Sequence, residues 1–544
     1  MVWMLIFWGC KGDRDTAADF SGDVTLTTDA EMARFCETQT AAAGDLRIEG
    51  VASASLASLS CLSAVGGSLT ILSSPELLDI GLPALSSLGG ELYIADNAAL
   101  EDISGLSALP AAASVVITDN AALEDISGLS ALSAVDDILS ISGCDSLATV
   151  SGLSALTEAG RLSLYSNDAL TALDGLSNLA ALSGLTIEEN LVLSTLTGLS
   201  GLETVTGDVR ISSNAALADL TGLAGLASID GALSIQANPA LTSLIGLSAL
   251  SSLGGDLSLY DNSALASSDG LSGLTALSGS VSVVDNDALT SLAGLAGLAS
   301  IDGSVLISGG GIADTALVGL SAVGGDLTIR DADSLSDIDL DSLTTLGGDL
   351  TIERCDGLSD LSGLSGLSTL SGDVLLCDND SLVGLTGLTG LTEAGTVEIC
   401  SSPALTSISG FSALTTTVGF LLTDNDALTS LAGLSALTAP GALKLHDNDA
   451  LASLDDLAAV RTVTDTLSIR YSASLLSVAG LHGVTAVGGD LKVTHNTALG
   501  DDAGQALLTA IGQENVSGEV SIKDNYPDED TGSPPDSGAA DSGK

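Results

Sequence analysis

The sequence predicts an all-β-dominated repeat solenoid with short capping helices, and three observations lead to this prediction. Residues 255–278 read GDLSLYDNSALASSDGLSGLTALS, and residues 279–302 repeat the pattern as GSVSVVDNDALTSLAGLAGLASID. Of the 544 residues, 45% are hydrophobic but only 2% are aromatic, and 63 are glycine. Such a chain builds its core from aliphatic residues at regular positions, as repeat proteins do when each turn packs only on its neighbours.

The repeat can be followed through one position that is most often asparagine. Neighbouring positions are mostly 23 or 24 residues apart, which predicts about twenty turns between residues 44 and 525. We expect these inward amides to form a structural ladder, in which each hydrogen bond to the turn's unpaired backbone contributes about 1 kcal/mol. The asparagines are Asn97, Asn120, Asn167, Asn190, Asn214, Asn238, Asn262, Asn286, Asn379, Asn425, Asn448, Asn496 and Asn525. Other residues at this position are Ser74, Cys144, Gly310, Ala332, Cys355, Ser402 and Ser472.

Each turn begins with a short predicted strand. In Leu257-Ser258-Leu259 the apolar residues alternate with serine, which places the leucines inward and Ser258 outward. Later leucines supply the other walls of the coil, and we expect Gly270 and Gly279 to allow its corners.

The two ends of the repeat region predict caps. Residues 21–43 form the expected N-terminal cap, where Thr28 and Glu31 match a capping box that opens a short helix. Within the solenoid of residues 44–525, residues 500–525 predict a C-terminal cap with an Asp-capped helix from about Asp502 to Gln513. Residues 526–544 have no apolar periodicity and predict a disordered acidic tail.

The first residues, MVWMLIFWGC, form a short apolar run that ends at Gly9-Cys10. The run is too short to span a bilayer but fits a signal segment over residues 1–10, followed by a short linker over residues 11–20. Cys10 after a small residue resembles a bacterial lipobox, although no Lys or Arg precedes the run and Phe7-Trp8 are bulky for that position. The resemblance implies lipidation at Cys10 and an exported chain anchored to the cell envelope, at the outer membrane or cell surface. An ordinary apolar amino terminus is the alternative.

The pattern G-D-L-x-I-x-D-N-x-x-L-x-x-L-x-G-L resembles the leucine-rich-repeat superfamily, and within it the receptor L-domain type found in bacterial cell-surface lipoproteins. The resemblance covers about residues 20–525. It implies a right-handed, parallel β-helix or leucine-rich-repeat-like solenoid with a parallel sheet along one face, and an extracellular binding or adhesion role. The motif residues are structural, so the resemblance assigns no functional residue to this chain.

Six cysteines remain besides Cys10. In an exported chain we expect Cys36 and Cys61 to staple the cap to the stack. Cys377 and Cys400 hold equivalent positions in consecutive turns, about 5 Å apart between Cα atoms, which suits a second disulfide. Cys144 and Cys355 occupy the asparagine position, where we expect buried thiols.

Charge and motif content exclude several function classes. The formal net charge is −56, and so acidic a surface repels phosphate backbones, so we expect no nucleic-acid partner and no membrane contact except through the lipid. We expect no enzyme activity, no cofactor and no metal site, because the only histidines, His446, His482 and His495, lie in no catalytic or zinc motif. Stacked Asp-Asn turns leave divalent cations as a weak possibility, but calcium needs six to eight oxygens.

The outward strand position is the natural binding surface. We expect it to serve binding or adhesion to an unidentified surface protein or glycan. A passive spacer or coat, or a periplasmic scaffold, is the alternative, because Ser234, Ser258 and Ser282 form a plain serine strip. The column reads Arg47, Thr70, Tyr93, Val116, Ser140, Ser163, Thr186, Arg210, Ser234, Ser258, Ser282, Leu306, Thr328, Thr351, Leu375, Glu398, Leu421, Lys444, Ser468, Lys492 and Ser521.

Overall fold

The computed structural model describes residues 22–526, which divide after Leu179 into two compact units. Unit 1 ends at Leu179 and unit 2 begins at Ala180. Cys10, the leader and the acidic tail from residue 527 onward lie outside the described residues, so what the sequence predicts for them stays a prediction. The helices within residues 22–526 are all too short or too polar to cross a bilayer.

Within each unit, every turn adds one longer strand to a parallel sheet. The register is regular, for example Leu233 beside Leu257 and Leu257 beside Val281. The predicted solenoid of parallel strands is therefore confirmed. The strands of unit 1 are β1 (Val24–Leu26), β3 (Leu46–Glu49), β5 (Leu69–Leu72), β7 (Glu91–Ala95), β9 (Ser114–Thr118), β10 (Ala134–Ser142) and β11 (Glu158–Tyr165). Those of unit 2 are β13 (Gly184–Glu188), β15 (Val209–Ser212), β17 (Leu233–Gln236), β19 (Leu257–Tyr260), β21 (Val281–Val284), β23 (Val305–Ser308), β25 (Leu327–Arg330), β27 (Leu350–Glu353), β29 (Val374–Cys377), β30 (Glu393–Cys400), β31 (Thr416–Thr423), β32 (Ala439–His446), β34 (Leu467–Arg470), β36 (Leu491–Thr494) and β37 (Val520–Lys523).

Two-residue strands precede most of these and, except for β8, which pairs with β10 in the large sheet, pair with one another in small parallel sheets. In unit 1 they are β2 (Ala41–Ala42), β4 (Ala64–Val65), β6 (Ser87–Leu88) and β8 (Ala111–Ala112). In unit 2 they are β12 (Ala181–Leu182), β14 (Thr204–Val205), β16 (Ser228–Ile229), β18 (Ser252–Leu253), β20 (Ala276–Leu277), β22 (Ser300–Ile301), β24 (Ala322–Val323), β26 (Thr345–Leu346), β28 (Thr369–Leu370), β33 (Thr462–Val463) and β35 (Ala486–Val487).

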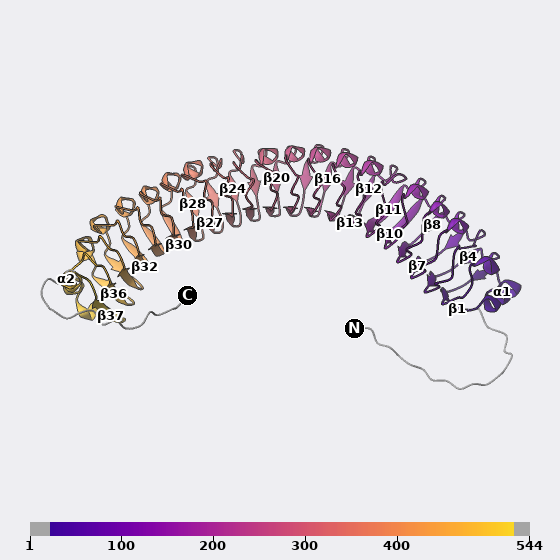
Figure 1. Ribbon diagram of the computed structural model, residues 1–544, viewed down its shortest axis with the longest axis horizontal. Helices are drawn as coiled ribbons and strands as arrows, with labels where there is room; N and C mark the ends of the chain where they lie inside the picture. Colours follow the sequence, from indigo (N-terminus) through magenta and orange to yellow (C-terminus); the bar gives the residue numbers. More distant parts are fainter. Residues whose placement is uncertain (1–21, 527–544) are drawn as a thin grey trace, which may run out of the picture. The chain divides into compact units, whose positions relative to one another are not determined.

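One-turn 3-10 helices close many of the turns. In each unit they lie on the side of the coil opposite the longer strands (Figure 1). They are η1 (Ala57–Leu59), η2 (Ser104–Leu106), η3 (Ser127–Leu129), η4 (Ser151–Leu153), η5 (Thr197–Leu199), η6 (Thr221–Leu223), η7 (Ile245–Leu247), η8 (Asp269–Leu271), η9 (Ala293–Leu295), η10 (Ser362–Leu364), η11 (Thr386–Leu388), η12 (Ser409–Phe411), η13 (Ala432–Leu434), η14 (Asp455–Leu457), η15 (Ala479–Gly483) and η16 (Gln513–Asn515).

The core is a column of aliphatic side chains inside the coil. In β19, Leu257 and Leu259 are fully buried while Ser258 between them faces outward, as the alternation predicts. Gly270 does not act as a flexible corner, which corrects the sequence prediction. It lies in η8, and a Cβ there would sit only 1.6 Å from the carbonyl oxygen of Leu244 in the preceding turn. Gly270 is therefore needed because successive turns approach closely, not because of an unusual backbone angle.

The bend after each strand is made by the residue before the asparagine position. Asp261, for example, has φ of 53°, in the left-handed region that Asp and Asn tolerate better than other non-glycine residues. Asn262 follows and is fully buried. Its Nδ2 donates to the carbonyl oxygens of Ile235 (2.9 Å) and Tyr260 (3.1 Å), and its Oδ1 accepts the backbone N–H of Asn238 at 3.1 Å. Each such amide thus satisfies backbone groups of its own turn and of the turn before it.

The two caps begin differently. Helix α1 (Asp29–Thr38) starts with the predicted capping box: Thr28 Oγ1 accepts the N–H of Glu31, and the Glu31 carboxylate accepts the N–H of Thr28. The predicted Asp cap of the second helix is wrong. Helix α2 (Asp501–Ile511) begins after Gly500, without a side-chain cap.

Asp501 has another use in the structure. Its Oδ1 accepts hydrogen bonds from the backbone N–H and the Nδ2 of Asn525, at 3.1 and 2.8 Å. The carboxylate therefore closes the asparagine ladder at its last turn, where no further asparagine follows within the described residues.

Candidate binding surface on the strand face

The outward column predicted from the sequence lies in register on adjacent strands of each unit. In unit 1, Arg47 is beside Thr70, and Thr70 beside Tyr93. In unit 2, Lys444 is beside Ser468, and Ser468 beside Lys492. Together with its neighbours along the sheet, this column forms the strand face, the side of each unit away from the 3-10 helices (Figure 1).

A second outward column, two residues further along each strand, was missed by the sequence reasoning. It brings Tyr165, Tyr260, Arg330 and Arg470 to the strand face, each at the last position of its strand. Tyrosine and arginine are the side chains on which binding energy concentrates in interfaces. The period-two alternation of strands, carried one step further before the Asp-Asn turn, would have identified this column.

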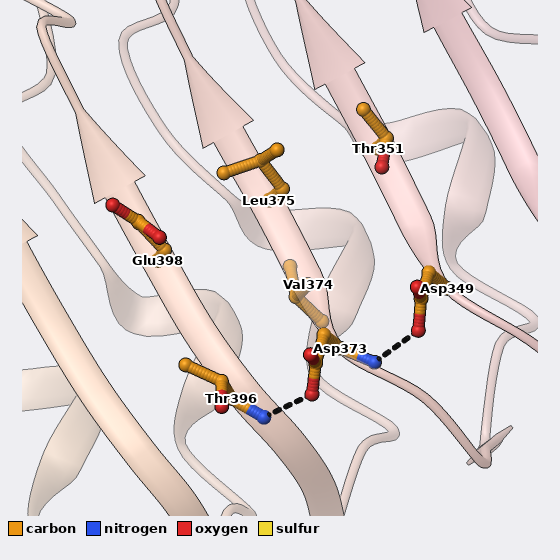
Figure 2. A pocket seen from close by; sticks show the side chains of 7 residues that line it. All are labelled: Asp349, Thr351, Asp373, Val374, Leu375, Thr396 and Glu398. Carbon is orange, nitrogen blue, oxygen red and sulfur yellow. Dashed lines mark hydrogen bonds between the residues drawn. The ribbon is translucent and has the colours of Figure 1, made fainter. Parts of the chain in front are cut away.

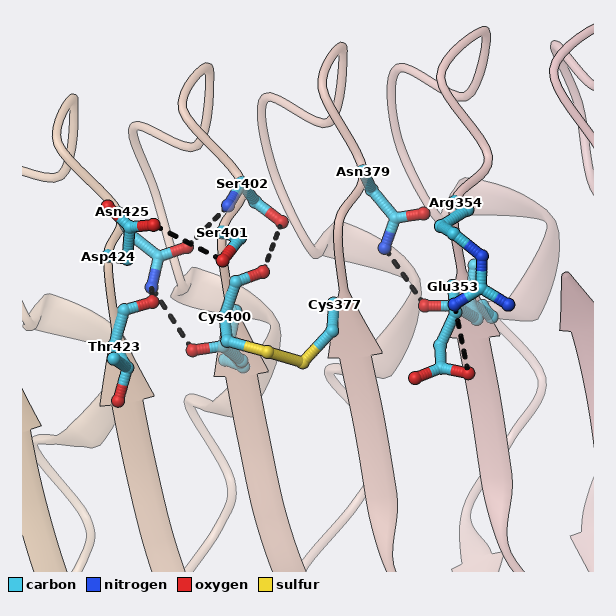
Figure 3. The surroundings of a disulfide bond; sticks show 12 residues. Glu353, Arg354, Cys377, Asn379, Cys400, Ser401, Ser402, Thr423, Asp424 and Asn425 are labelled. Atoms are coloured by element: carbon cyan, nitrogen blue, oxygen red, sulfur yellow. Dashed lines mark hydrogen bonds and ion pairs between the residues drawn. A yellow bond between two sulfur atoms is a disulfide. The ribbon is translucent and has the colours of Figure 1, made fainter. Parts of the chain in front are cut away.

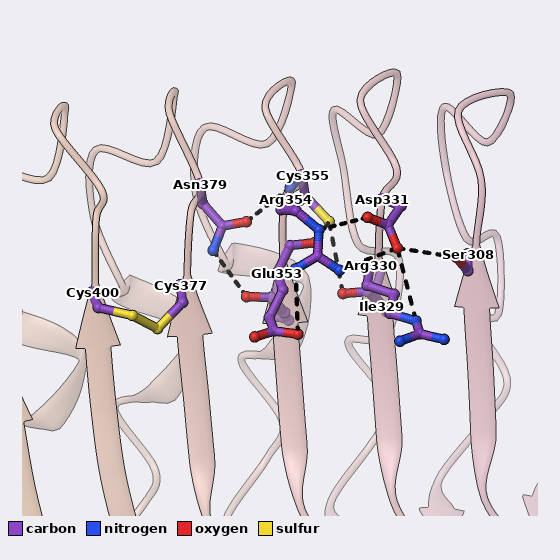
Figure 4. Close-up of polar contacts among 11 residues, drawn as sticks. Ser308, Ile329, Arg330, Asp331, Glu353, Arg354, Cys355, Cys377, Asn379 and Cys400 are labelled. Atoms are coloured by element: carbon purple, nitrogen blue, oxygen red, sulfur yellow. Dashed lines mark hydrogen bonds and ion pairs between the residues drawn. A yellow bond between two sulfur atoms is a disulfide. The ribbon is translucent and has the colours of Figure 1, made fainter. Parts of the chain in front are cut away.

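A charged network lies at the edge of the strand face, at the ends of β25 and β27 and in the bends that follow them. The Arg354 guanidinium binds both carboxylate oxygens of Asp331, with its Nε 2.6 Å and its Nη2 3.3 Å away (Figure 4). Arg330 and Glu353 add longer ion pairs of 3.8 and 3.9 Å, and Ser308 Oγ donates to Asp331. The hydrogen bond from Arg354 lowers the pKa of Asp331. These groups are half-exposed, so the network fixes side-chain positions more than it stabilises the fold.

A disulfide joins the next two strands on the same face. Cys377 ends β29 and Cys400 ends β30, with their Cα atoms 4.5 Å apart (Figure 3). The second expected pair, Cys36 in α1 and Cys61 after η1, is also joined, with its Cα atoms 5.7 Å apart. Disulfides persist in oxidising compartments, so the two bonds indicate an exported chain.

A shallow hollow of about 170 Å³ opens over β27, β29 and β30. Asp349 and Asp373 line it, but their carboxylates already accept backbone N–H groups of the following turn, Asp373 at 2.7 Å and Thr396 at 2.5 Å (Figure 2). The remaining lining includes Leu375 and Glu398. The hollow therefore offers one apolar contact and one free carboxylate, which suits the side of a larger ligand more than an enclosed small molecule.

The strand face becomes basic at its C-terminal end. A hollow of about 220 Å³ there has mainly cationic and hydroxyl-bearing walls, in a chain whose net charge is −56. It is lined by Arg470, Lys492, Thr494, His495, Glu519, Ser521 and Lys523.

The candidate catalytic groups are not brought together. His446 ends β32, and its Nε2 is 2.8 Å from Ser468 Oγ on the next strand, β34. His495 instead stacks on Tyr471, which follows β34. Burial raises the pKa of the Cys144 thiol to about 12 and that of Cys355 to about 11, so neither is a thiolate near neutral pH. Among residues 22–526, no three His, Cys, Asp or Glu side chains are placed to hold a metal ion together.

Comparisons with known proteins find likeness in structure only. No protein-family model matches the chain, and no curated protein matches it. An internalin from Listeria monocytogenes matches 69% of this chain and 84% of its own at 15% identity, with a TM-score of 0.27. The TLR13–ssRNA13 complex matches 94% of this chain and 85% of its own at 15% identity, with a TM-score of 0.31. A leucine-rich-repeat protein from Leptospira interrogans matches 68% and 91% at 15% identity, with a TM-score of 0.29.

The fold is a leucine-rich-repeat solenoid. The geometry of the chain itself has the features of such a solenoid. Each turn has a parallel strand whose inward residues are mostly leucine, isoleucine or valine, most turns carry a buried asparagine or a substitute after it, and many close through a one-turn helix. The receptor L-domain subtype stays a prediction from the sequence pattern.

Proposed function

We propose that this protein is a non-catalytic binding scaffold, anchored by lipid to the bacterial cell envelope, with the strand face as its recognition surface at the cell surface. The observation that carries the proposal is the pair of outward columns. They place side chains of varied chemistry in register on strands that lie about 4.8 Å apart. An outward, regularly spaced set of this kind gives a partner a continuous surface to contact, and the helices of each unit lie on its other side (Figure 1).

The anchoring part of the proposal rests on the sequence. Gly9-Cys10 follows a short apolar run, as a lipidated cysteine does after a signal segment. The two disulfides support passage through an oxidising compartment.

The ligand that we propose is a protein or glycan of another cell surface. One observation favours a passive spacer instead for part of unit 2. Ser234, Ser258 and Ser282 are neighbours in register, so the strand face there is a strip of short hydroxyl side chains. We therefore place recognition in the turns that carry arginine, tyrosine and lysine, and a spacer role in the serine strip.

Protease shaving of intact cells tests the display at the surface. The cells express the epitope-tagged protein together with a periplasmic control protein. Cleavage of the tagged protein while the control survives supports surface display. Survival of both until the outer membrane is permeabilised would end the adhesion proposal and favour a periplasmic scaffold.

A variant tests the anchor separately. With Cys10→Ser, radiolabelled palmitate should no longer enter the protein, and the protein should leave the membrane fraction. The matched control is Cys144→Ser, which changes the same side chain at a buried position of unit 1. Undiminished labelling of the Cys10→Ser protein would refute lipidation at this site.

A further inference from the structure

Four neighbouring strands at the C-terminal end of unit 2 carry cations in an alternating arrangement. Strands β32, β34, β36 and β37 are consecutive in the sheet. In the first outward column, Lys444 and Lys492 alternate with serines. In the second, Arg470 and Lys523 alternate with His446 and Thr494, so every strand has one Lys or Arg and the gaps hold hydroxyl or imidazole groups.

This arrangement is unusual for the chain. The four cations are among only 14 Lys and Arg residues, against 70 Asp and Glu residues. Cations set about 10 Å apart along each column, two strand spacings, with donors between them, match a ligand that presents negatively charged oxygens.

Two of the four cations have no ion-pair partner among the described residues. Within residues 22–526, neither Lys444 nor Arg470 forms an ion pair. The Arg470 side chain is nevertheless held in place, because its Nε donates to Thr494 Oγ1 at 3.2 Å and its guanidinium lies 4.9 Å from the ring centroid of Tyr471. Arg470 is thus oriented by neutral groups and forms no ion pair, although its charge also acts on the Asp447 carboxylate, whose pKa burial raises and Arg470 lowers.

The other two cations are partly neutralised. Lys492 Nζ lies 2.7 Å from Asp490, and Lys523 Nζ lies 4.0 Å from Asp524. All of these groups are partly exposed, so the pairs are weak and exchange with solvent ions.

The hollow of about 220 Å³ at this end brings three of the cations to one place. Arg470, Lys492 and Lys523 line it together with the hydroxyls of Thr494 and Ser521. Glu519 is the acidic member of the lining, so the positive groups outnumber it three to one. A carboxylate, sulfate or phosphate group fits a space of this size.

His446 is a partly buried neighbour of two of these cations. The pKa of His446 is lowered to about 4, first by burial and then by Arg470 and Lys444. His446 is therefore neutral near pH 7, and its ring contributes hydrogen bonding through Ser468 in place of charge.

We propose that this basic end of the strand face, formed by Lys444, Arg470, Lys492 and Lys523, binds the oxyanion group of a short ligand, such as the carboxylates of an acidic oligosaccharide. The ligand is short because the remaining chain is strongly acidic and repels a long polyanion beyond these strands. The inference deepens the proposed binding function and rests on the strand face being its recognition surface.

Calorimetric titration of the full mature chain at low ionic strength tests the site. Three probes separate the sources of the anion: a short oligogalacturonide for carboxylate, inorganic sulfate, and inorganic phosphate. We expect saturable binding of at least one probe, weakened by added salt because the charges are exposed. In Arg470→Gln, the affinity should fall about tenfold or more, as expected for one charge-assisted contact.

The matched control is Arg461→Gln. It removes the same charge from the same region of unit 2, but Arg461 donates to the carbonyl oxygens of Ala458 and Val460 and is not on a longer strand. This variant should bind like the wild type. Circular dichroism checks that both variants are folded. Lys444→Gln removes a second charge of the basic end and should also weaken binding.

Three outcomes would overturn the inference: no saturable binding of any probe, equal weakening in Arg461→Gln and Arg470→Gln, or stronger binding of a long single-stranded oligonucleotide than of the short probes. None of them alters the result of protease shaving. Conversely, if shaving places the protein in the periplasm and the anion site still binds, surface adhesion is refuted and this inference stands.

Discussion

Replacing one rung of the asparagine ladder should unfold the turns around it. In Asn262→Leu, the side chain keeps its number of heavy atoms and its branch at Cγ, although two methyl groups are bulkier than an amide, and every polar contact of the amide is lost. The carbonyl oxygens of Ile235 and Tyr260 lose a donor, and the backbone N–H of Asn238 loses its acceptor. The site is fully buried, so water does not replace these partners. At about 1–3 kcal/mol for each stranded group, less the gain from a buried leucine, we expect a loss of roughly 3–5 kcal/mol.

Hydrogen exchange read by mass spectrometry is the appropriate assay, because a long repeat array can open in part without a single unfolding transition. Peptides that cover β17, β19 and β21 should lose protection by two or more orders of magnitude, while peptides of unit 1 should keep theirs. Asn178→Leu is the matched control. That side chain is exposed and makes one bond, to the carbonyl oxygen of Ser154, so its cost should stay within about 0.5 kcal/mol. Equal protection in the Asn262→Leu and wild-type proteins would refute the ladder as a source of stability.

Three further perturbations have outcomes that follow from the structure. Gly270→Ala should lower the thermal midpoint by several degrees, because the new Cβ would lie 1.6 Å from the Leu244 carbonyl oxygen and the turns must separate. Replacing Cys36 and Cys61 by serine should cost about 3 kcal/mol in the N-terminal cap, measured as faster limited proteolysis of α1, because a loop closed over a sequence separation of 25 is released. Stability should also fall as the pH is lowered from 6.5 toward 4, because the unfolded chain protonates His446 in this window while the folded chain, with its pKa near 4, does not.

Each of these predictions has a control. Gly310→Ala places a methyl group where no atom lies within 4 Å, so it should leave the midpoint unchanged. A reducing agent should speed the limited proteolysis of α1 in the wild type, as the double substitution does. In the double-serine protein it should not change the rate further. In the pH series, His446→Gln should remove the fall in stability between pH 6.5 and 4. His482→Gln, at an exposed site, should leave that fall unchanged. If the stability of His446→Gln still falls between pH 6.5 and 4, other titrating groups cause the fall.

The strand register could be predicted almost completely because the physics that fixes it is local. A period of two in Leu257-Ser258-Leu259 says which residues face the core, and a repeat of 23 or 24 residues says which strands are neighbours. The position of the disulfide partners Cys377 and Cys400 followed from the same counting. The repeat spacing could not predict the distance between the 3-10 helices of successive turns, and the need for Gly270 depends on that distance. That distance is determined by how whole turns pack on one another, so the sequence of a single repeat does not predict it.

The binding surface could be predicted in outline only. One outward column was identified, but the second one was missed, because the predicted three-residue strands, such as Leu257-Ser258-Leu259, stop one residue before Tyr260 and its equivalent Arg470. The actual bend is made one residue later, by Tyr471 and Asp261, which adopt left-handed backbone angles. The choice of helix cap failed for a similar reason. Asp501 has the right chemistry for a cap, but Asn525, distant in sequence, competes for its carboxylate.

The asparagine ladder also determines where a pulled chain would break first. Each Oδ1 accepts the N–H of the turn before it, so the turns between Asn214 and Asn286 are tied one to the next. Of the two positions that follow, Ala332 is buried but has no side-chain oxygen to offer. Gly310 is exposed and lies outside the ladder, which corrects its predicted inward position. Under tension along the coil, the turns between Asn286 and Cys355 should part before those on either side. The solenoid would then lengthen in a defined place and spare the basic end and the serine strip from the first rupture.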